Sequence, residues 1–469
     1  MTDLHDFSIP RLIVSGLRGG SGKTILSLCL VTLFREKNLK VTPFKKGPDY
    51  IDAGWLAKAA DSPCYNLDLF MMTPEQALQS FMSHSHNAQI ALIEGNRGLY
   101  DGVDHEGTYS TAELAKLLKA PVIIIVDCTK ATNTIAAMVL GCQKMDTKVP
   151  IGGVVLNQVA TARQEAVIKK AIHMKSNLPV VGAIPKLKKD PFPERHMGLT
   201  PFQEHQDIDQ SFALVAEIGG KYIDVEQVLK IANEAQQIKM GQGSDRIDLS
   251  QSKGAPSVKI GIIRDSAFQF YYQENFEELE KRGAALIEVS PLREKQLPDI
   301  DALYIGGGFP ETHAIALADN TSFRKALCSA IDKGLPVYAE CGGLMYLGKE
   351  LVLDGRKYPM AGIFPIVFGM ERKPQAHGYT VVEVEETNPY FPQKTVLKGH
   401  EFHYSRVLDF EKGDSSLVFS VRRGKGIIDN KDGLCYKNVL AAYTHLHAIG
   451  SPEWADGAVR CATAFRGLK

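Results

Sequence analysis

The sequence predicts an α/β protein of two domains, each built on a mainly parallel sheet. Its 469 residues exceed one average domain. In both halves, short apolar runs without polar alternation are separated by longer helical patterns, as expected for strands that are buried on both faces. Between the halves, residues 233–255 are polar and poor in large apolar side chains. We therefore expect domains at 8–235 and 258–469, joined by a linker at 236–257.

The candidate strands are runs rich in Val, Ile and Leu. In the first domain they are Arg11–Ser15, Lys40–Phe44, Ile90–Ile93, Pro121–Asp127, Ile151–Leu156 and Pro179–Ile184. In the second they are Val258–Ile263, Ala285–Val289, Ala302–Ile305, Pro336–Ala339 and the period-two run Tyr379–Glu385. Because ligands of open α/β sheets gather at the carboxyl ends of strands, the residues that follow these runs are candidate site residues.

Composition argues against several classes of protein. The 54 basic side chains balance 54 acidic ones, so we expect neither nucleic acid nor a membrane surface as a partner. The 8 cysteines include no C-x-x-C pair, which argues against a zinc site or a disulfide framework. Residues 1–12 lack the apolar core of a signal peptide, and the longest apolar run, Pro121–Val126, is shorter than a membrane span. We expect a cytoplasmic protein.

A glycine-rich loop, Gly19–Thr24, follows the first strand. Its glycines allow a tight turn whose N–H groups point at anionic oxygens, its lysine adds positive charge, and its threonine can bind Mg²⁺. Leu17 stands where G-x-x-x-x-G-K-[ST] has its first glycine, so the match is to the x-G-G-x-G-K-T variant led by Arg18. A strand–helix turn without a ligand is the alternative. The expected nucleotide-binding residues are Gly19, Gly20, Gly22, Lys23 and Thr24.

Acidic residues follow the neighbouring strands. Asp49 and Asp52 come after the second strand, Glu94 ends the third, and Asp101 lies just beyond it. Each alone could be a helix cap or a turn residue. Together they predict a magnesium site, because Mg²⁺ prefers hard oxygen ligands. The pair Lys45–Lys46 could balance phosphate charge, and we expect one of the two to face solvent.

The second domain carries a candidate nucleophile, Cys341. It follows a short strand and precedes Gly342–Gly343 and a helical pattern over Leu344–Glu350. A nucleophile on such a sharp turn is exposed, and a helix N-terminus favours the thiolate. The glycines within Tyr304–Pro310 could donate N–H groups to an oxyanion, and His445 could be the base. A buried apolar cysteine and a packed histidine are the alternatives.

Taken in order, these motifs resemble the cobyrinic acid a,c-diamide synthase family of glutamine-dependent amidotransferases. The resemblance runs from about Arg11 to Phe465. It is carried by Gly19–Thr24, Phe44–Asp52, Asn66–Asp68, Glu94–Gly102, Ile305–Glu311, Glu340–Leu344, Gly399–Ser405 and Tyr443–His447. It implies a synthetase domain like dethiobiotin synthetase, followed by a class I glutaminase domain. It also implies ATP and Mg²⁺ as cofactors, and L-glutamine and a tetrapyrrole carboxylate as partners. A homodimer is a further expectation.

The resemblance assigns roles to these residues. Cys341 would form a thioester with glutamine and release ammonia, with His445 activating the thiol. ATP would phosphorylate an acetate carboxylate of the ring, and ammonia would then displace the phosphate. The oxyanion donors would be Gly307, Gly308 and Gly342. The residues around the phosphoryl group would be Lys45, Asp49, Asp52 and Asp101, with Asn157 at the adenine and Thr24, Asp52 and Glu94 at Mg²⁺.

Two parts of the family pattern leave questions open. General glutaminases carry Glu two residues after the histidine, where this chain has His447, so the third triad member is open. The segment His400–Ser405, with His400, Glu401, His403 and Tyr404, is expected to touch substrate or the seam between the domains, or else to be a packed histidine cluster.

The identity of the ring is also open. Asn96 and Arg97 stand where many cobyrinate enzymes carry Val-Met, and we expect them to contact the ring. Amidases of sirohaem and of nickel sirohydrochlorin perform the same chemistry, so those rings are the alternative substrates. A partitioning-type regulatory ATPase and a binding module with an inactive glutaminase are alternatives of other classes.

Overall fold

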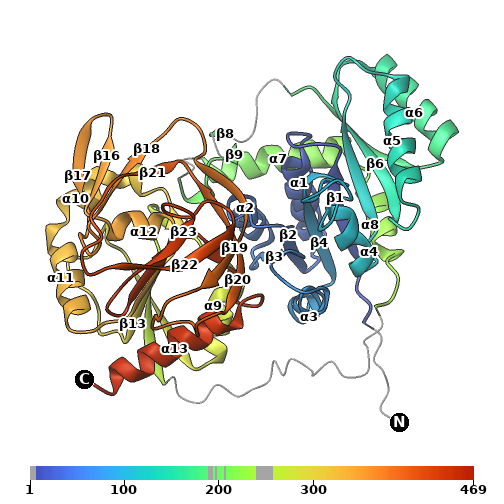
Figure 1. The fold of residues 1–469 in the computed structure, drawn as a ribbon. Helices are drawn as coiled ribbons and strands as arrows, with labels where there is room; N and C mark the ends of the chain where they lie inside the picture. The colour runs from blue at the N-terminus through green and yellow to red at the C-terminus, as the bar shows by residue number, and fades with distance from the viewer. Residues whose placement is uncertain (1–6, 188–193, 196–197, 205–206, 239–256) are drawn as a thin grey trace, which may run out of the picture. The chain divides into compact units, whose positions relative to one another are not determined.

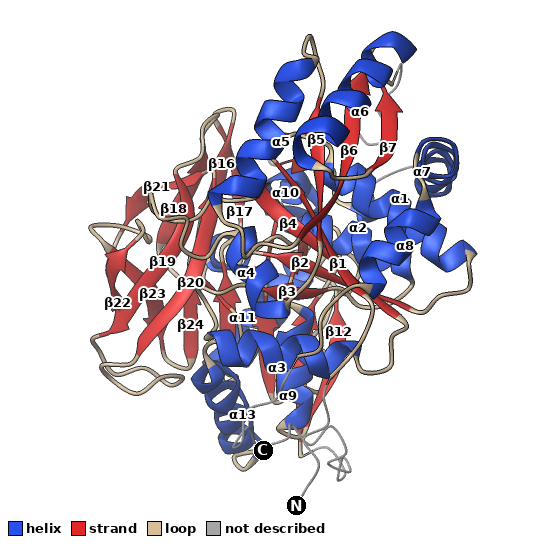
Figure 2. Ribbon diagram, turned by 90° about the vertical axis from the view of Figure 1, so that its right-hand side faces the viewer, coloured by secondary structure: helices blue, strands red, loops and turns tan. Residues whose placement is uncertain are grey.

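The computed structural model describes residues 7–187, 194–195, 198–204, 207–238 and 257–469 (Figures 1 and 2). The chain divides into two compact units, Met1–Leu249 and Ser250–Lys469. Most of the linker expected at 236–257 lies outside the described residues. The predicted domain boundaries therefore stay predictions, and each unit is described by itself.

The first unit contains a seven-stranded parallel sheet with strand order β3-β2-β4-β1-β5-β6-β7. Its strands are β1 (Arg11–Gly16), β2 (Val41–Lys46), β3 (Tyr65–Leu67), β4 (Ile90–Gly98), β5 (Val122–Asp127), β6 (Ile151–Val159) and β7 (Val180–Pro185). Six of them coincide with predicted runs, although β4 and β6 extend further. Strand β3 was not predicted, because three residues are too few to show a period.

Helices pack against this sheet. They are α1 (Lys23–Glu36), α2 (Ile51–Ala60), α3 (Pro74–Ser85), α4 (Thr111–Leu118), α5 (Asn133–Met145), α6 (Ala162–Ser176), α7 (Ile208–Tyr222) and α8 (Val225–Asn233). Helices α1, α2, α7 and α8 share one core with the sheet. All residues from Val122 to Val126 are fully buried, which explains why that run shows no polar alternation. The short elements β8 (Glu194–Arg195), β9 (Gly198–Leu199) and η1 (Phe202–Glu204) precede α7.

The second unit contains a ten-stranded mixed sheet with strand order β12-β10-β13-β15-β24-β23-β22-β19-β20-β25. The strands from β12 to β24 are parallel, and the pairings from β24 onwards are antiparallel. This change explains the period-two pattern of the last hundred residues. The strands are β10 (Val258–Ile263), β12 (Ala284–Val289), β13 (Ala302–Ile305), β15 (Val337–Glu340), β19 (Ala376–Val384), β20 (Val396–His403), β22 (Ser416–Arg423), β23 (Lys431–Tyr436), β24 (Val439–Ala442) and β25 (His445–Leu446).

Smaller elements complete the second unit. Two further sheets are formed by β11 (Phe268–Phe270) with β14 (Gly307–Gly308), and by β16 (Glu350–Leu353), β17 (Arg356–Pro359), β18 (Ile366–Met370) and β21 (Ser405–Phe410). The helices are α9 (Gln273–Lys281), η2 (Pro310–His313), α10 (Ala314–Asp319), α11 (Thr321–Asp332), α12 (Gly342–Leu347) and α13 (Pro452–Arg466). The helix predicted at Leu344–Glu350 is confirmed over Leu344–Leu347, and its predicted C-terminal end is wrong because β16 begins at Glu350. Within the described ranges, no helix is long and apolar enough to cross a membrane.

Candidate active site

The glycine-rich loop joins β1 to α1. Gly22 is the N-cap of α1 and has a φ of 96°, a conformation that L side chains rarely adopt. A side chain here would also overlap the amide of Asn157 on β6. That amide donates to the carbonyl of Ser21 at 2.9 Å. Asn157 thus supports the loop backbone, and the adenine contact expected of it stays a prediction.

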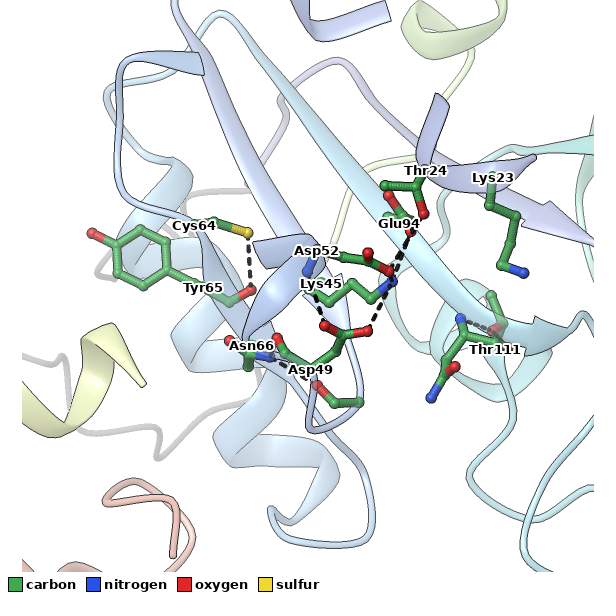
Figure 3. Close-up of polar contacts among 12 residues, drawn as sticks. Lys23, Thr24, Lys45, Asp49, Asp52, Cys64, Tyr65, Asn66, Glu94 and Thr111 are labelled. Carbon is green, nitrogen blue, oxygen red and sulfur yellow. Dashed lines mark hydrogen bonds and ion pairs between the residues drawn. The ribbon is translucent and has the colours of Figure 1, made fainter. Parts of the chain in front are cut away.

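A network of charged side chains lies beside the loop (Figure 3). The ammonium of Lys45 is 2.7 Å from both Asp52 Oδ2 and Glu94 Oε1, and 3.7 Å from Asp49 Oδ2. The Thr24 hydroxyl donates to Glu94 Oε1 at 2.9 Å and lies 3.4 Å from Asp52 Oδ2. The structure therefore brings together five residues that the sequence had predicted as site residues; four come from α1, β2, α2 and β4, and Asp49 from the turn after β2.

Burial and mutual charge shift the pKa values of this network. Burial raises the pKa of Asp49 to about 7, with a further contribution from Asp52, and burial also raises the pKa of Glu94. Burial opposes the shift at Asp52, but the Lys45 ammonium lowers its pKa. Although burial lowers the pKa of Lys45, Asp52 and Glu94 hold it well above its usual value. Three carboxylates thus share one ammonium, which favours binding of a further cation.

The network meets the requirements of Mg²⁺. Glu94 Oε2 is buried and has no hydrogen-bond partner in the part of the chain that the structure describes. No cage of three or more His, Cys, Asp or Glu side chains is found among the described residues. Mg²⁺ rarely uses such a cage, because it takes one or two carboxylates and completes its shell with phosphates and waters. The hydroxyl of Thr24 and the carboxylates of Asp52 and Glu94 fit that pattern.

Lys46 corrects the expectation that one lysine of the pair faces solvent. Lys45 is 2% exposed and Lys46 is 5% exposed. Both are buried because β2 lies between β3 and β4 inside the sheet, so both rows of its side chains are covered. Burial lowers the pKa of Lys46, Asp68 raises it, and the charge of Arg97 lowers it further.

Asn96 and Arg97 lie close to this lysine. A Cβ added to Gly47 would be 3.0 Å from the Asn96 amide, so the turn after β2 touches the end of β4. Arg97 has a φ of 50°, and Thr111 hydrogen-bonds the backbone of Asn96. The structure thus places a buried lysine beside the two residues predicted to contact the ring.

Asp101 lies beside the loop lysine. Its Oδ2 accepts a hydrogen bond from the Gly98 N–H at 2.8 Å. Burial and Lys45 lower the pKa of Lys23, whereas the charges of Glu94, Asp52 and Asp101 raise it. Lys23 itself donates to the carbonyl of Arg18 at 3.2 Å.

Cys341 occupies the sharp turn between β15 and α12. Its φ of 47° and ψ of −99° are a strained conformation for an L residue, as at other nucleophile turns. The expectation of an exposed thiol is wrong, because Cys341 is only 6% exposed. Its Sγ lies 3.9 Å from the carbonyl of Phe402, so β20 passes over the turn.

His445 lies against this thiol. Burial alone would lower its pKa, but hydrogen bonds to Cys341 and Glu340 raise it to about 10. A Cβ added to Gly307 would be 2.6 Å from His445 Cε1, so the glycine allows the imidazole to approach. One added to Gly342 would be 3.0 Å from the Gly308 nitrogen. The thiol, the imidazole and the three predicted oxyanion glycines are therefore together.

Sequence reasoning missed Glu340. Its Oε2 lies 3.3 Å from Nδ1 of His445. The general glutaminase pattern places the third triad member at the position of His447. The Nε2 of His447 instead lies 3.6 Å from Glu274 Oε2. The available signal was the position of Glu340 at the end of a strand, directly before the nucleophile.

His400 and His403, both on β20, are packed inside the second unit. The ring of His400 stacks on His445 with centroids 4.8 Å apart, and His403 stacks on Tyr443 at 3.6 Å. Nδ1 of His403 donates to the Ser405 carbonyl at 2.8 Å, and burial lowers the pKa of His403 to about 4. Their contact with substrate, like that of the half-buried Tyr404, stays a prediction.

Comparison with known proteins agrees with the two sites. Residues 12–199 match the model of the CobQ/CobB/MinD/ParA nucleotide binding domain, and residues 259–453 match that of the CobB/CobQ-like glutamine amidotransferase domain. Proteins named cobyrinate a,c-diamide synthase are 38% identical in Magnetococcus marinus (96% of each chain) and 38% in Archaeoglobus fulgidus (96% of this chain, 97% of the relative). The relative in Methanothermobacter thermautotrophicus is 37% identical (97% and 100%).

The chain belongs to the cobyrinate a,c-diamide synthase family. Membership confirms the predicted order, a nucleotide-binding domain followed by a glutamine amidotransferase domain. It also confirms the predicted class of enzyme, a glutamine-dependent amidating ligase. A partitioning-type ATPase would account only for the first domain, whereas the relatives align along nearly the whole chain.

Proposed function

We propose that this chain catalyses the ATP- and glutamine-dependent amidation of the a and c acetate carboxylates of cobyrinic acid in cobalamin biosynthesis. The observation that carries the proposal is the presence, in one chain, of the Lys45 network and the Cys341–His445 pair. An activated carboxylate and a source of ammonia are the two requirements of amide formation. Relatives named for this reaction support the choice of substrate.

In the first unit, the glycine loop and Lys23 bind the phosphates of ATP. The substrate carboxylate attacks the γ-phosphorus, which gives an acyl phosphate and ADP. Ammonia then attacks the acyl carbon and phosphate leaves with the C–O electron pair. Lys45 would neutralise the transferred phosphoryl group, while Asp49 and Asp52 hold the Lys45 ammonium and the charge of Asp101 acts on Lys23.

Mg²⁺ would be held by Thr24, Asp52 and Glu94, and when bound it supplies charge neutralisation at the phosphate oxygens. The unpartnered Glu94 Oε2 supports this assignment. Lys45 contacts the same two carboxylates, so it keeps them in place before the ion binds.

In the second unit, the Cys341 thiolate attacks the glutamine carboxamide. The N–H groups around Gly307, Gly308 and Gly342 would stabilise the oxyanion, and His445 gives a proton to the departing ammonia. Water then hydrolyses the thioester to glutamate. This reaction is chemically separate from ATP use, because ammonia itself is the shared intermediate.

The ring site is proposed at Lys46, Asn96 and Arg97. Two cations near the Lys45 network suit a substrate that carries several carboxylates. Sirohaem and nickel sirohydrochlorin carry such groups too and remain the alternative rings. We place the reaction in the cytoplasm, in keeping with the eight free cysteines. We expect no membrane or nucleic-acid partner. A homodimer remains an expectation.

The test is an amidation assay with each of the three rings, ATP, Mg²⁺ and glutamine, with products counted by mass. We expect cobyrinic acid to give a diamide and the other rings to react at least tenfold more slowly. A tenfold difference in rate corresponds to about 1.4 kcal/mol less binding of the transition state. Preference for another ring would replace the substrate and keep the mechanism. Glutamine hydrolysis without any ATP-dependent amidation would contradict the proposal.

A further inference from the structure

Glu340 faces the imidazole of His445 inside the second unit. Its Oε2 lies 3.3 Å from His445 Nδ1, and the two side chains are 1% and 2% exposed. Water hardly screens a pair that is buried to this degree, so the carboxylate acts on the imidazole more strongly than a surface carboxylate would.

The carboxylate is itself held in place. The hydroxyl of Tyr304 donates to Oε2 at 3.0 Å, and the backbone N–H of Leu446 donates to Oε1 at 3.1 Å. The second donor belongs to the residue after His445. Glu340 is therefore fixed to the same short strand, β25, that carries the imidazole, which sets both the distance and the direction of the contact.

This contact selects a tautomer. When Nδ1–H of His445 is donated to Glu340, Nε2 is left as an acceptor. A Cβ added to Gly307 would be 3.3 Å from that Nε2, so this edge of the ring faces the proposed oxyanion loop. The Cys341 thiol also raises the pKa of the imidazole, and Nε2 is the nitrogen that the contact with Glu340 leaves for it.

Burial keeps three titratable groups near His445 in their neutral forms at pH 7. His400 stacks on it from β20, and burial lowers the pKa of His400 well below its usual value. Burial likewise lowers the pKa of His403 to about 4, and burial raises the pKa of Tyr304 well above its usual value. Among these surrounding groups, Glu340 supplies the negative charge on the side of the imidazole that faces away from the thiol.

We propose that Glu340 is the positioning residue of the glutaminase site. It holds His445 in the orientation and tautomer that accept the Cys341 proton, and it stabilises the resulting imidazolium. It replaces the carboxylate that general glutaminases carry two residues after the histidine. This inference rests on the proposed glutaminase function. At the usual position, His447 is engaged by Glu274 and by the ring of Tyr272, with centroids 4.6 Å apart.

The test measures glutamine hydrolysis by the full chain over a range of pH. For Glu340→Gln we expect kcat to fall on the order of 10²–10⁴-fold, as when the acid of a related triad is made an amide. KM for glutamine should change by less than about threefold, because Glu340 does not touch substrate. The alkaline limb of the pH profile should move to lower pH, since the imidazolium loses its counter-charge, and Glu340→Asp should recover part of the rate.

The matched control is Glu274→Gln, another buried carboxylate beside a histidine in the same unit. It should keep kcat and the pH profile. An active wild type with an unchanged Glu340→Gln would overturn the inference, and so would Glu274→Gln reproducing the loss. A wild type that hydrolyses no glutamine would instead overturn the proposed function and the inference together.

A second variant keeps the inference testable if Glu340→Gln fails to fold. If Glu340→Gln also loses ammonia-dependent amidation, Tyr304→Phe is used instead. It removes one hydrogen bond to Glu340, together with a long one from Asn275 at 3.4 Å, and keeps the carboxylate. It should lower kcat about tenfold and shift the alkaline limb in the same direction. An unchanged kcat and pH profile in a folded Tyr304→Phe chain would overturn the inference.

Discussion

In the first unit three carboxylates surround the ammonium of Lys45, whereas in the second unit one carboxylate, Glu340, faces the imidazole of His445. The first arrangement carries surplus negative charge and is completed by cations that arrive with ATP. The second pairs one carboxylate with one imidazole, so no further acidic side chain has to be compensated by a ligand. A site for phosphoryl transfer must change its charge with each cycle, while a site for a covalent nucleophile must keep the nucleophile charged between cycles.

The hydrogen bonding of the two buried carboxylates, Glu94 and Glu340, differs in the same sense. Glu94 keeps an unpartnered oxygen within the described part of its unit, whereas both oxygens of Glu340 accept hydrogen bonds. A buried acceptor without a partner is unfavourable until a ligand binds. We therefore expect the first site to gain stability from its ligands and the second to be ordered without them.

The largest expected effect is that of Cys341→Ala. The thioester cannot form, so glutamine-dependent amidation should fall by about 10⁴-fold or more. Amidation with added ammonia should continue, because free ammonia bypasses the thiol. The measurement is the rate of ring amidation with either nitrogen source. The control is Cys328→Ala, which removes a half-buried thiol on α11 and should change neither rate. Failure of ammonia to rescue Cys341→Ala would contradict the separation of the two sites.

The next effect is that of Lys23→Ala. Loss of the loop ammonium should reduce ATP-dependent amidation on the order of 10³-fold, because phosphate charge is no longer neutralised in the transition state. Glutamine hydrolysis should remain measurable. Lys37→Ala, at the exposed end of α1, is the control and should leave both activities intact. If a folded Lys23→Ala chain lost both reactions, the comparison between two independent sites would be wrong.

The sequence alone predicts the elements that depend on a local pattern of residues. The unbroken apolar run Val122–Val126 predicts a central strand, and Gly19–Thr24 predicts a loop of known shape. Glu340 could not be predicted as the partner of His445, because the two are 105 positions apart and meet only through the pairing of β15 with β24. The burial of Lys46 depends on β3, whose three residues carry no periodic signal.

A smaller effect is expected for Lys46→Met. The variant keeps most of the side-chain volume and removes a charge that we assign to a ring carboxylate. One charge-assisted hydrogen bond corresponds to about 1.4 kcal/mol, so KM for the ring should rise about tenfold with little change in kcat. Steady-state kinetics with saturating ATP and ammonia would measure it, and Lys58→Met on the surface of α2 is the control. A rise in KM for ATP instead would move Lys46 from the ring site to the nucleotide site.

The smallest effect concerns Asp49 and tests the surplus of negative charge directly. Burial raises the pKa of Asp49 to about 7, while an unfolded Asp titrates near about 3.9. Between these values the folded state binds more protons than the unfolded state, so this group lowers stability as the pH rises through the window. Asp49→Asn lacks the titrating carboxyl group. The difference in thermal midpoint, variant minus wild type, should therefore rise by a few degrees between about pH 4 and about pH 7 and stay constant above that range. The measurement is thermal unfolding of both proteins without ATP or Mg²⁺, in which the contributions of other groups cancel. A difference that stays constant with pH would mean that neither burial nor the charge of Asp52 raises the pKa of Asp49, and the contrast in charge between the two sites would then lose its support.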